Sequence, residues 1–114
     1  MLREVLQSKI HKATITEADI SYIGSITIDV DLLERIDLWP GQKVTVVSNT
    51  SGNRLETYVI AGARNSGMIC MNGAAAHLIK KGDEVIIFSY ALSDRQIKPK
   101  CILVDEHNRY IQDL

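Results

Sequence analysis

Cysteine, proline, histidine and aromatic residues are all scarce in this chain. Its 114 residues include two cysteines, two prolines and three histidines, and only 5% are aromatic. The cysteines, Cys70 and Cys101, form no C-x-x-C pair, so a redox motif is not indicated and each is read as a small core residue. The histidines lie far apart in the sequence, without the spacing of metal ligands, so we expect no metal site.

Charge of one sign and long apolar runs are also missing. The formal net charge is -1, and no run of Lys or Arg extends along the chain. This balance argues against a nucleic-acid or anionic-membrane partner. No stretch is apolar enough to span a bilayer, and the opening "MLREVLQSKI" lacks the apolar core of a signal peptide. We therefore expect a cytoplasmic protein with reduced thiols.

Strand patterns dominate what is present, in a chain whose length suggests one domain, residues 1–114. Short connections separate about seven β-like segments and two helix-like segments. The pattern predicts a mainly β fold, a small six- to seven-stranded barrel with short helices rather than a βαβ sheet. The expected strands are 9–16, 25–30, 42–49, 54–62, 67–71, 83–91 and 99–106, and the expected helices are 31–38 and 74–81.

Two details of the helices are also predicted. Asp31 and Glu34 have the spacing of a capping box at the start of the first helix. Gly82 follows the second helix where a C-terminal cap belongs.

The segment "YIGS" (22–25) places Gly24 and Ser25 at the entrance of an alternating strand. A glycine there indicates a turn, a bulge or a close backbone approach, and the residues alone favour a simple turn. In "RLETYV", Arg54, Glu56 and Tyr58 share one strand face. That face fits a carboxylate clamp beside a proton donor, although a solvated face is the more common explanation.

Two further segments leave the choice open. Lys9 and His11 share another strand face, which a solvated surface also explains. In "MNGAAAH" (71–77), Asn72 precedes a glycine and three alanines. Such small residues suit either exposed backbone N–H groups that bind an anion or tight packing of a small helix.

Taken together, these segments resemble the pyruvoyl-dependent aspartate 1-decarboxylases. The resemblance rests on "SKIH", "YIGSITID", "RLETYVIAG" and "CMNGAAAH" followed by "GDEVII", in this order from about residue 1 to about residue 105. It implies a double-psi β-barrel that assembles as a homotetramer, with active sites between subunits. It also implies a function: decarboxylation of L-aspartate to β-alanine for pantothenate and coenzyme A biosynthesis.

The resemblance gives the Gly-Ser pair a role in self-processing. The chain would cut itself between Gly24 and Ser25 into fragments 1–24 and 25–114, and Ser25 would become a covalent pyruvoyl group. That group would hold the substrate amine as a Schiff base and act as the electron sink, in place of pyridoxal phosphate and without a metal. A separate maturation factor is a possible partner.

The resemblance also assigns roles to the other candidate residues. Tyr58 would be the proton donor, and Asn72 would support an oxyanion during processing. Thr57 would act near the Gly24 carbonyl and near bound substrate. The remaining residues would bind the substrate or line its pocket: Lys9, Arg54, Gly73, Ala74 and Ala75 in binding, and His11 and Tyr22 in the lining.

Two other classes of function remain alternatives. One is a non-catalytic barrel module, such as a DNA-binding regulator, which would have no reason to cut itself. The other is a pyruvoyl enzyme for a different amino acid, which assays with other substrates would detect.

Overall fold

One nine-stranded sheet makes up most of the chain. The computed structural model describes all residues, 1–114. In chain order the elements are β1 (Arg3–Thr14), β2 (Glu17–Asp19), β3 (Ser25–Asp29), α1 (Val30–Arg35), β4 (Lys43–Ser48), β5 (Arg54–Gly62), β6 (Ile69–Asn72), the 3-10 helix η1 (Gly73–His77), β7 (Glu84–Ser93), β8 (Lys100–Val104) and β9 (Tyr110–Asp113). The mainly β, barrel-like architecture with short helices confirms the predicted fold class. The strand count is higher than predicted, because the short strands β2 and β9 were not expected.

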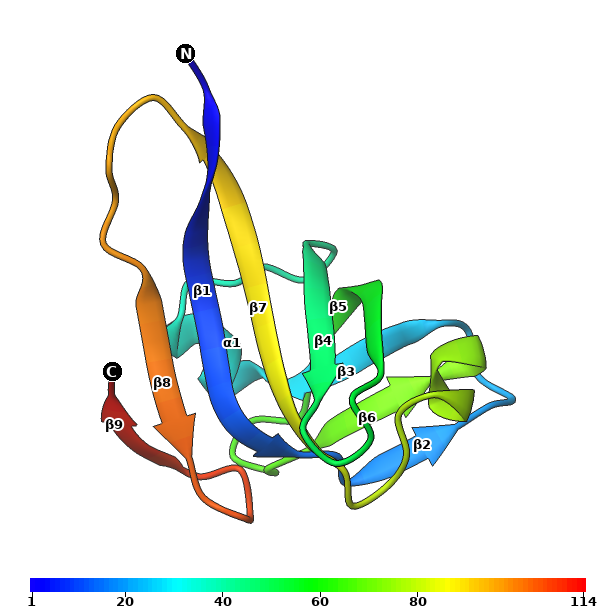
Figure 1. Cartoon of the computed structure of the whole chain (residues 1–114). Coiled ribbons are helices and arrows are strands. Elements are labelled where there is room, and N and C mark those ends of the chain that lie inside the picture. The colour runs from blue at the N-terminus through cyan, green and yellow to red at the C-terminus, as the bar shows by residue number, and fades with distance from the viewer.

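The sheet curves around a core, with its strands in the order β2-β6-β3-β5-β4-β7-β1-β8-β9. Most neighbours are antiparallel, but β1 with β8, β2 with β6 and β3 with β5 are parallel. Figure 1 shows β1 and β7 as a long pair, with β8 and β9 beside it and η1 near β2 and β6. The parallel pairs bring together segments that are distant in sequence, including β3, which carries Ser25, and β5, which carries Arg54, Thr57 and Tyr58.

The first helix begins earlier than predicted. Asp29 is its N-cap, and the Asp29 carboxylate accepts a hydrogen bond from the Asp31 backbone N–H at 2.9 Å. The predicted capping box at Asp31 and Glu34 is therefore wrong. Glu34 instead binds the exposed guanidinium of Arg64, at 2.8 Å from each carboxylate oxygen.

The second helix is shorter than predicted and ends at His77. Gly82, with φ of +89°, lies in a later turn and donates its backbone N–H to the Ile15 carbonyl at 2.8 Å. The predicted helix cap at Gly82 is wrong, although the residue does need the left-handed conformation that glycine tolerates.

Twenty buried hydrophobic side chains form a single core cluster. The strand β3 crosses its centre, where Ile26 and Ile28 are fully buried and Val59 of β5 and Met71 of β6 flank Ile26. Burial on this scale is the main force that holds a domain of this size together. It also fixes the strand on which the candidate cleavage bond lies.

A buried polar network ties the C-terminal turn to the barrel. The side chain of Asn108 accepts a hydrogen bond from the Thr14 N–H and donates to the carbonyls of Thr14 and Gly67, each at 2.8 Å. The Asp29 carboxylate accepts backbone N–H groups of Asn65 and Gly67 on the same loop. These bonds satisfy polar groups that would be costly to bury alone.

None of the helices is long and apolar enough to cross a lipid bilayer.

Candidate functional site

In the turn before β3, Gly24 lies at the surface, and the next residue, Ser25, is buried. Asp19 stabilises this turn, because its carboxylate accepts both the backbone N–H and the hydroxyl of Ser21, at 2.9 and 2.6 Å. These bonds lower the pKa of Asp19. Tyr22 is exposed, Gly24 is exposed, and Ser25 is completely buried. The Gly24–Ser25 bond thus lies at the boundary between a surface turn and the core.

Asn72 lies directly opposite Ser25, because β3 and β6 pair antiparallel in that register. Its side-chain Nδ2 donates to the Ser25 hydroxyl at 3.0 Å and to the Thr27 hydroxyl at 2.9 Å. Ser25 and Thr27 are two residues apart, so both point to the strand face that Asn72 occupies. The Asn72 amide therefore holds the Ser25 hydroxyl, the candidate nucleophile, in place next to the Gly24–Ser25 bond.

Gly73 allows the backbone of Tyr22 and Gly24 to come unusually close to its own Cα. Its φ is +73°, and a Cβ on this residue would lie 2.6 Å from the Gly24 Cα and 2.9 Å from the Tyr22 carbonyl oxygen. No other residue type fits both the torsion and the space. We call Gly24, Ser25, Thr27, Asn72 and Gly73 the cleavage cluster. The alanines that follow, Ala74 and Ala75, lie in η1, exposed and half-buried respectively.

Tyr58 lies on β5, the strand next to β3. Ile26 and Val59 are register partners and both point into the core, so the residues before them, Ser25 and Tyr58, point away from it on adjacent strands. Tyr58 is 41% exposed, which leaves its hydroxyl accessible. Thr57 points to the opposite face of β5 and pairs with Val44. In the structure the Asn72 side-chain amide donates a hydrogen bond to Thr27 and not to Thr57.

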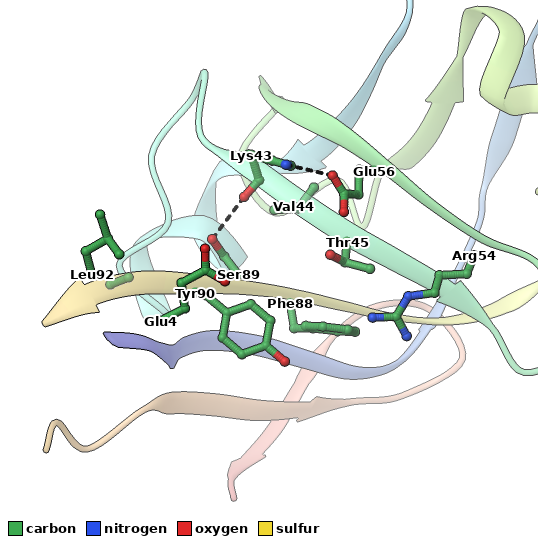
Figure 2. Close-up of a pocket in the computed structure, with 11 residues that line it drawn as sticks. Glu4, Lys43, Val44, Thr45, Arg54, Glu56, Phe88, Ser89, Tyr90 and Leu92 are labelled. Atoms are coloured by element: carbon green, nitrogen blue, oxygen red, sulfur yellow. Dashed lines mark hydrogen bonds and ion pairs between the residues drawn. The ribbon is translucent and has the colours of Figure 1, made fainter. Parts of the chain in front are cut away.

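Arg54 lies at the far end of β5 from Tyr58, in a pocket of about 270 Å³. Figure 2 shows its guanidinium turned toward the ring of Phe88, and the charge lies 5.6 Å from the ring centre. Lys43, Glu56 and Tyr90 also line this pocket, whereas Ser25 and Tyr58 do not. Four residues of strand separate Arg54 from Tyr58 by roughly 13 Å. Within one chain, the candidate carboxylate-binding group and the cleavage cluster are therefore separate.

Lys9 lies on the same side of the sheet as Arg54. It pairs with Phe88 across β1 and β7 and with Cys101 across β1 and β8. The Lys9 charge lowers the pKa of the Cys101 thiol, but burial raises it more, so the thiol is held in its neutral form.

His11 lies further along β1, beside a bulge where Lys12 has φ of +61°. The Nδ1 atom of His11 is buried without a hydrogen-bond partner. A buried polar atom of this kind calls for a partner. Neither Lys9 nor His11 contacts the cleavage cluster in one chain.

The structure thus brings together only part of the predicted site. Gly24, Ser25, Asn72 and Gly73 are in contact, and Tyr58 is on the neighbouring strand. Sequence reasoning missed Thr27, although its position two residues after Ser25 was a usable signal. No cluster of three or more His, Cys, Asp or Glu side chains is arranged to hold a metal ion.

The comparisons with known proteins agree over nearly the whole chain. A family model for aspartate decarboxylase matches residues 1–111. An aspartate 1-decarboxylase of Acetivibrio thermocellus is 54% identical, over 97% of this chain and 91% of the relative. The aspartate 1-decarboxylase of Neisseria meningitidis is 52% identical, over 100% and 92% of the two chains. That of Pelotomaculum thermopropionicum is 51% identical, over 98% and 88%.

Proposed function

The chain belongs to the aspartate decarboxylase family, and we propose that it converts L-aspartate to β-alanine and carbon dioxide after cutting itself at Gly24–Ser25. The β-alanine would serve pantothenate and coenzyme A biosynthesis. The observation that carries the proposal is the hydrogen bond from Asn72 to the buried Ser25 hydroxyl, next to a Gly73 that leaves room for Gly24.

The cleavage cluster fits the self-processing step. The Ser25 hydroxyl attacks the Gly24 carbonyl carbon, the C–N bond breaks, and the Ser25 nitrogen takes up the proton, which leaves an ester. Loss of the Ser25 Cα proton then breaks the Cβ–Oγ bond and releases the Gly24 carboxylate, which leaves a dehydroalanine. This enamine takes up a proton at Cβ to become an imine, and water hydrolyses the imine to the ketone and ammonia. Asn72 would support the oxyanion of this step once its Nδ2 turns from a hydroxyl that it now binds, because both of its N–H groups donate to Ser25 and Thr27. Such a donor stabilises charge that develops on oxygen.

After cleavage, the mature chain 25–114 would begin with a pyruvoyl group in place of Ser25. This ketone supplies the electron sink for loss of the substrate α-carboxylate. Tyr58, on the adjacent strand and on the same face as Ser25, donates the proton to the carbon that lost carbon dioxide. A phenol hydroxyl is among the side-chain groups that serve as general acids.

Arg54 and Lys9 bind the carboxylates of the substrate in this proposal. The guanidinium of Arg54 can grip a carboxylate through two parallel N–H groups, which a lysine cannot do. The backbone of Gly73, Ala74 and Ala75 lies against the substrate on the other side, with Thr57 nearby. His11 and Tyr22 complete the lining of the pocket.

Assembly into a homotetramer would bring these parts together at subunit interfaces. Exposed apolar side chains support it, because clusters of this kind mark interaction surfaces. Ile20, Tyr22 and Ile23 lie next to Gly24, and Met1, Leu2 and Leu92 lie at the end of the β1–β7 pair. The tetramer in the cytoplasm, with or without a maturation factor, is the working form we propose, and light scattering tests its mass.

Denaturing intact-mass spectrometry tests the proposal directly. We expect two fragments, one ending at Gly24 and one beginning at residue 25, the second lighter than a serine-started peptide by one ammonia. Production of β-alanine from L-aspartate by the cut protein completes the test, with L-glutamate as the control substrate. A chain that stays uncut after prolonged warming, with no β-alanine formed, contradicts the proposal.

A further inference from the structure

An ion pair lies between the two groups proposed for binding and protonation. The ammonium of Lys43 is 2.7 Å from the carboxylate of Glu56, and both side chains are mostly exposed. Glu56 is two residues from Arg54 and two from Tyr58 on the same face of β5. Lys43 on β4 is the register partner of Tyr58. Figure 2 shows Glu56 turned toward Lys43 and Arg54 turned toward Phe88.

Stability does not explain this pair. Ion pairs between exposed side chains contribute little to folding, typically about 0.2–1 kcal/mol. The Lys43 backbone is nevertheless held firmly, because its carbonyl accepts the Ser89 hydroxyl at 2.9 Å. The base of the Lys43 side chain is therefore fixed, and the ion pair places its ammonium beside Glu56.

Glu56 has a second possible partner. Arg54 is its neighbour on the same strand face, within reach of two long side chains. The bond to Lys43 is the main cause that lowers the pKa of the Glu56 carboxyl, and the charge of Arg54 contributes in the same direction. Without Lys43, the nearest cation left for this carboxylate is Arg54.

We propose that Lys43 is a positioning residue that holds Glu56 away from Arg54 and so leaves the Arg54 guanidinium free for a substrate carboxylate. The inference rests on the proposed function, because it concerns how the same enzyme binds L-aspartate. Its physical basis is competition: a carboxylate of the protein and a carboxylate of the substrate cannot both occupy the same fork of donors. Lys43 also offsets a negative charge that would repel a dicarboxylate substrate.

The test is steady-state kinetics of the self-processed Lys43→Met protein. Glu56 then turns to Arg54, and KM for L-aspartate rises about three- to fivefold, the size expected for one exposed ion pair, with kcat nearly unchanged. Lys43→Arg keeps the pair and keeps KM near the wild-type value. The double variant Lys43→Met with Glu56→Gln removes the competitor and returns KM toward wild type.

The outcomes separate this inference from the proposed function. An unchanged KM in Lys43→Met, in a wild-type background that makes β-alanine, overturns the role of Lys43 alone. A fall in kcat with constant KM also overturns it, because it would show that Lys43 acts on its register partner Tyr58. Failure of the double variant to restore KM rules out competition by Glu56. Absence of β-alanine formation by the wild-type protein refutes the proposed function itself.

Discussion

The cleavage cluster and the outer face of β5 are built in opposite ways. In the cleavage cluster, Ser25 is completely buried and Asn72 is 6% exposed, and the two are joined by a hydrogen bond. On β5, Arg54, Glu56 and Tyr58 are all exposed, and the first two are charged. In the first region the polar side chains are joined to one another by hydrogen bonds, whereas the second region is open to solvent.

This difference matches two different tasks. The proposed self-cleavage is an intramolecular step that occurs once, so it needs fixed geometry rather than access for a substrate. Turnover needs a surface that substrate can reach and leave. Tyr58 lies opposite Ser25 when the β3–β5 register is extended by one residue, so on the outer face of β5 it is the residue nearest Ser25 and the place where the two regions meet. Changes in the two regions should therefore separate processing from turnover.

The largest effect is expected from Ser25→Ala. Without the hydroxyl there is no nucleophile and no precursor of the ketone, so both cleavage and decarboxylation should be abolished. Intact mass should show one uncut chain, and circular dichroism should show a folded one, because the methyl group fits the space of the side chain. Ser21→Ala, in the exposed turn just before, is the matched control and should still cleave. Cleavage that persists in Ser25→Ala would remove this residue from the mechanism.

Tyr58→Phe should separate self-cleavage from turnover. The ring stays and only the hydroxyl is lost, so cleavage should go to completion while kcat falls by about 10²- to 10⁴-fold, as for loss of a general acid. Tyr90→Phe removes a hydroxyl from the pocket around Arg54 and serves as the control with near-normal kcat. Near-normal turnover in Tyr58→Phe would show that the proton comes from another group.

Gly73→Ala should damage the cleavage cluster without touching a reacting atom. The new Cβ would lie 2.6 Å from the Gly24 Cα, in a residue with φ of +73°. We expect a loss of about 2–4 kcal/mol in stability and strongly slowed cleavage, measured by denaturant unfolding and timed intact mass. Gly52→Ala is the control, because Gly52 has φ of +80° but nothing within 4 Å of its Cβ position. Equal effects in both variants would argue against the close approach to Gly24.

The sequence predicted those parts of the fold that depend on local pattern. Alternation and the turn residues before it placed the strand 54–62 at the bounds that β5 has. The short strands β2 and β9 lack such a pattern: β9 is fully exposed, and β2 consists of three residues held by pairing with β6. The start of α1 was misplaced because two aspartates, Asp29 and Asp31, compete as caps, and only the observed fold shows which one is oriented to accept.

The site was predicted in its residue types but not in its contacts. That Asn72 lies opposite Ser25 depends on the register between β3 and β6, across 47 residues, and no periodicity contains that information. The resemblance to a known family supplied the candidates, whereas the structure shows which of them touch. It also separates Arg54 from the cleavage cluster in one chain, a separation that no local pattern in the residues predicts.

Thr27→Val should give the smallest effect and test how the cleavage cluster is oriented. The Thr27 hydroxyl accepts the second hydrogen bond of the Asn72 amide, at 2.9 Å, and so fixes the direction of the first bond to Ser25. Valine keeps the shape but leaves one amide hydrogen without its partner, a loss of about 1 kcal/mol. If part of that loss appears in the transition state, cleavage should slow about three- to fivefold, measured by timed intact mass, while kcat of the fully processed enzyme stays near wild type. Thr27→Ser keeps the hydroxyl and should restore the rate. Near-normal cleavage in Thr27→Val with slow cleavage in Thr27→Ser would instead point to packing of the Thr27 methyl against Gly62, whose Cβ position lies 3.1 Å from it, and the orienting role of the hydroxyl would be lost.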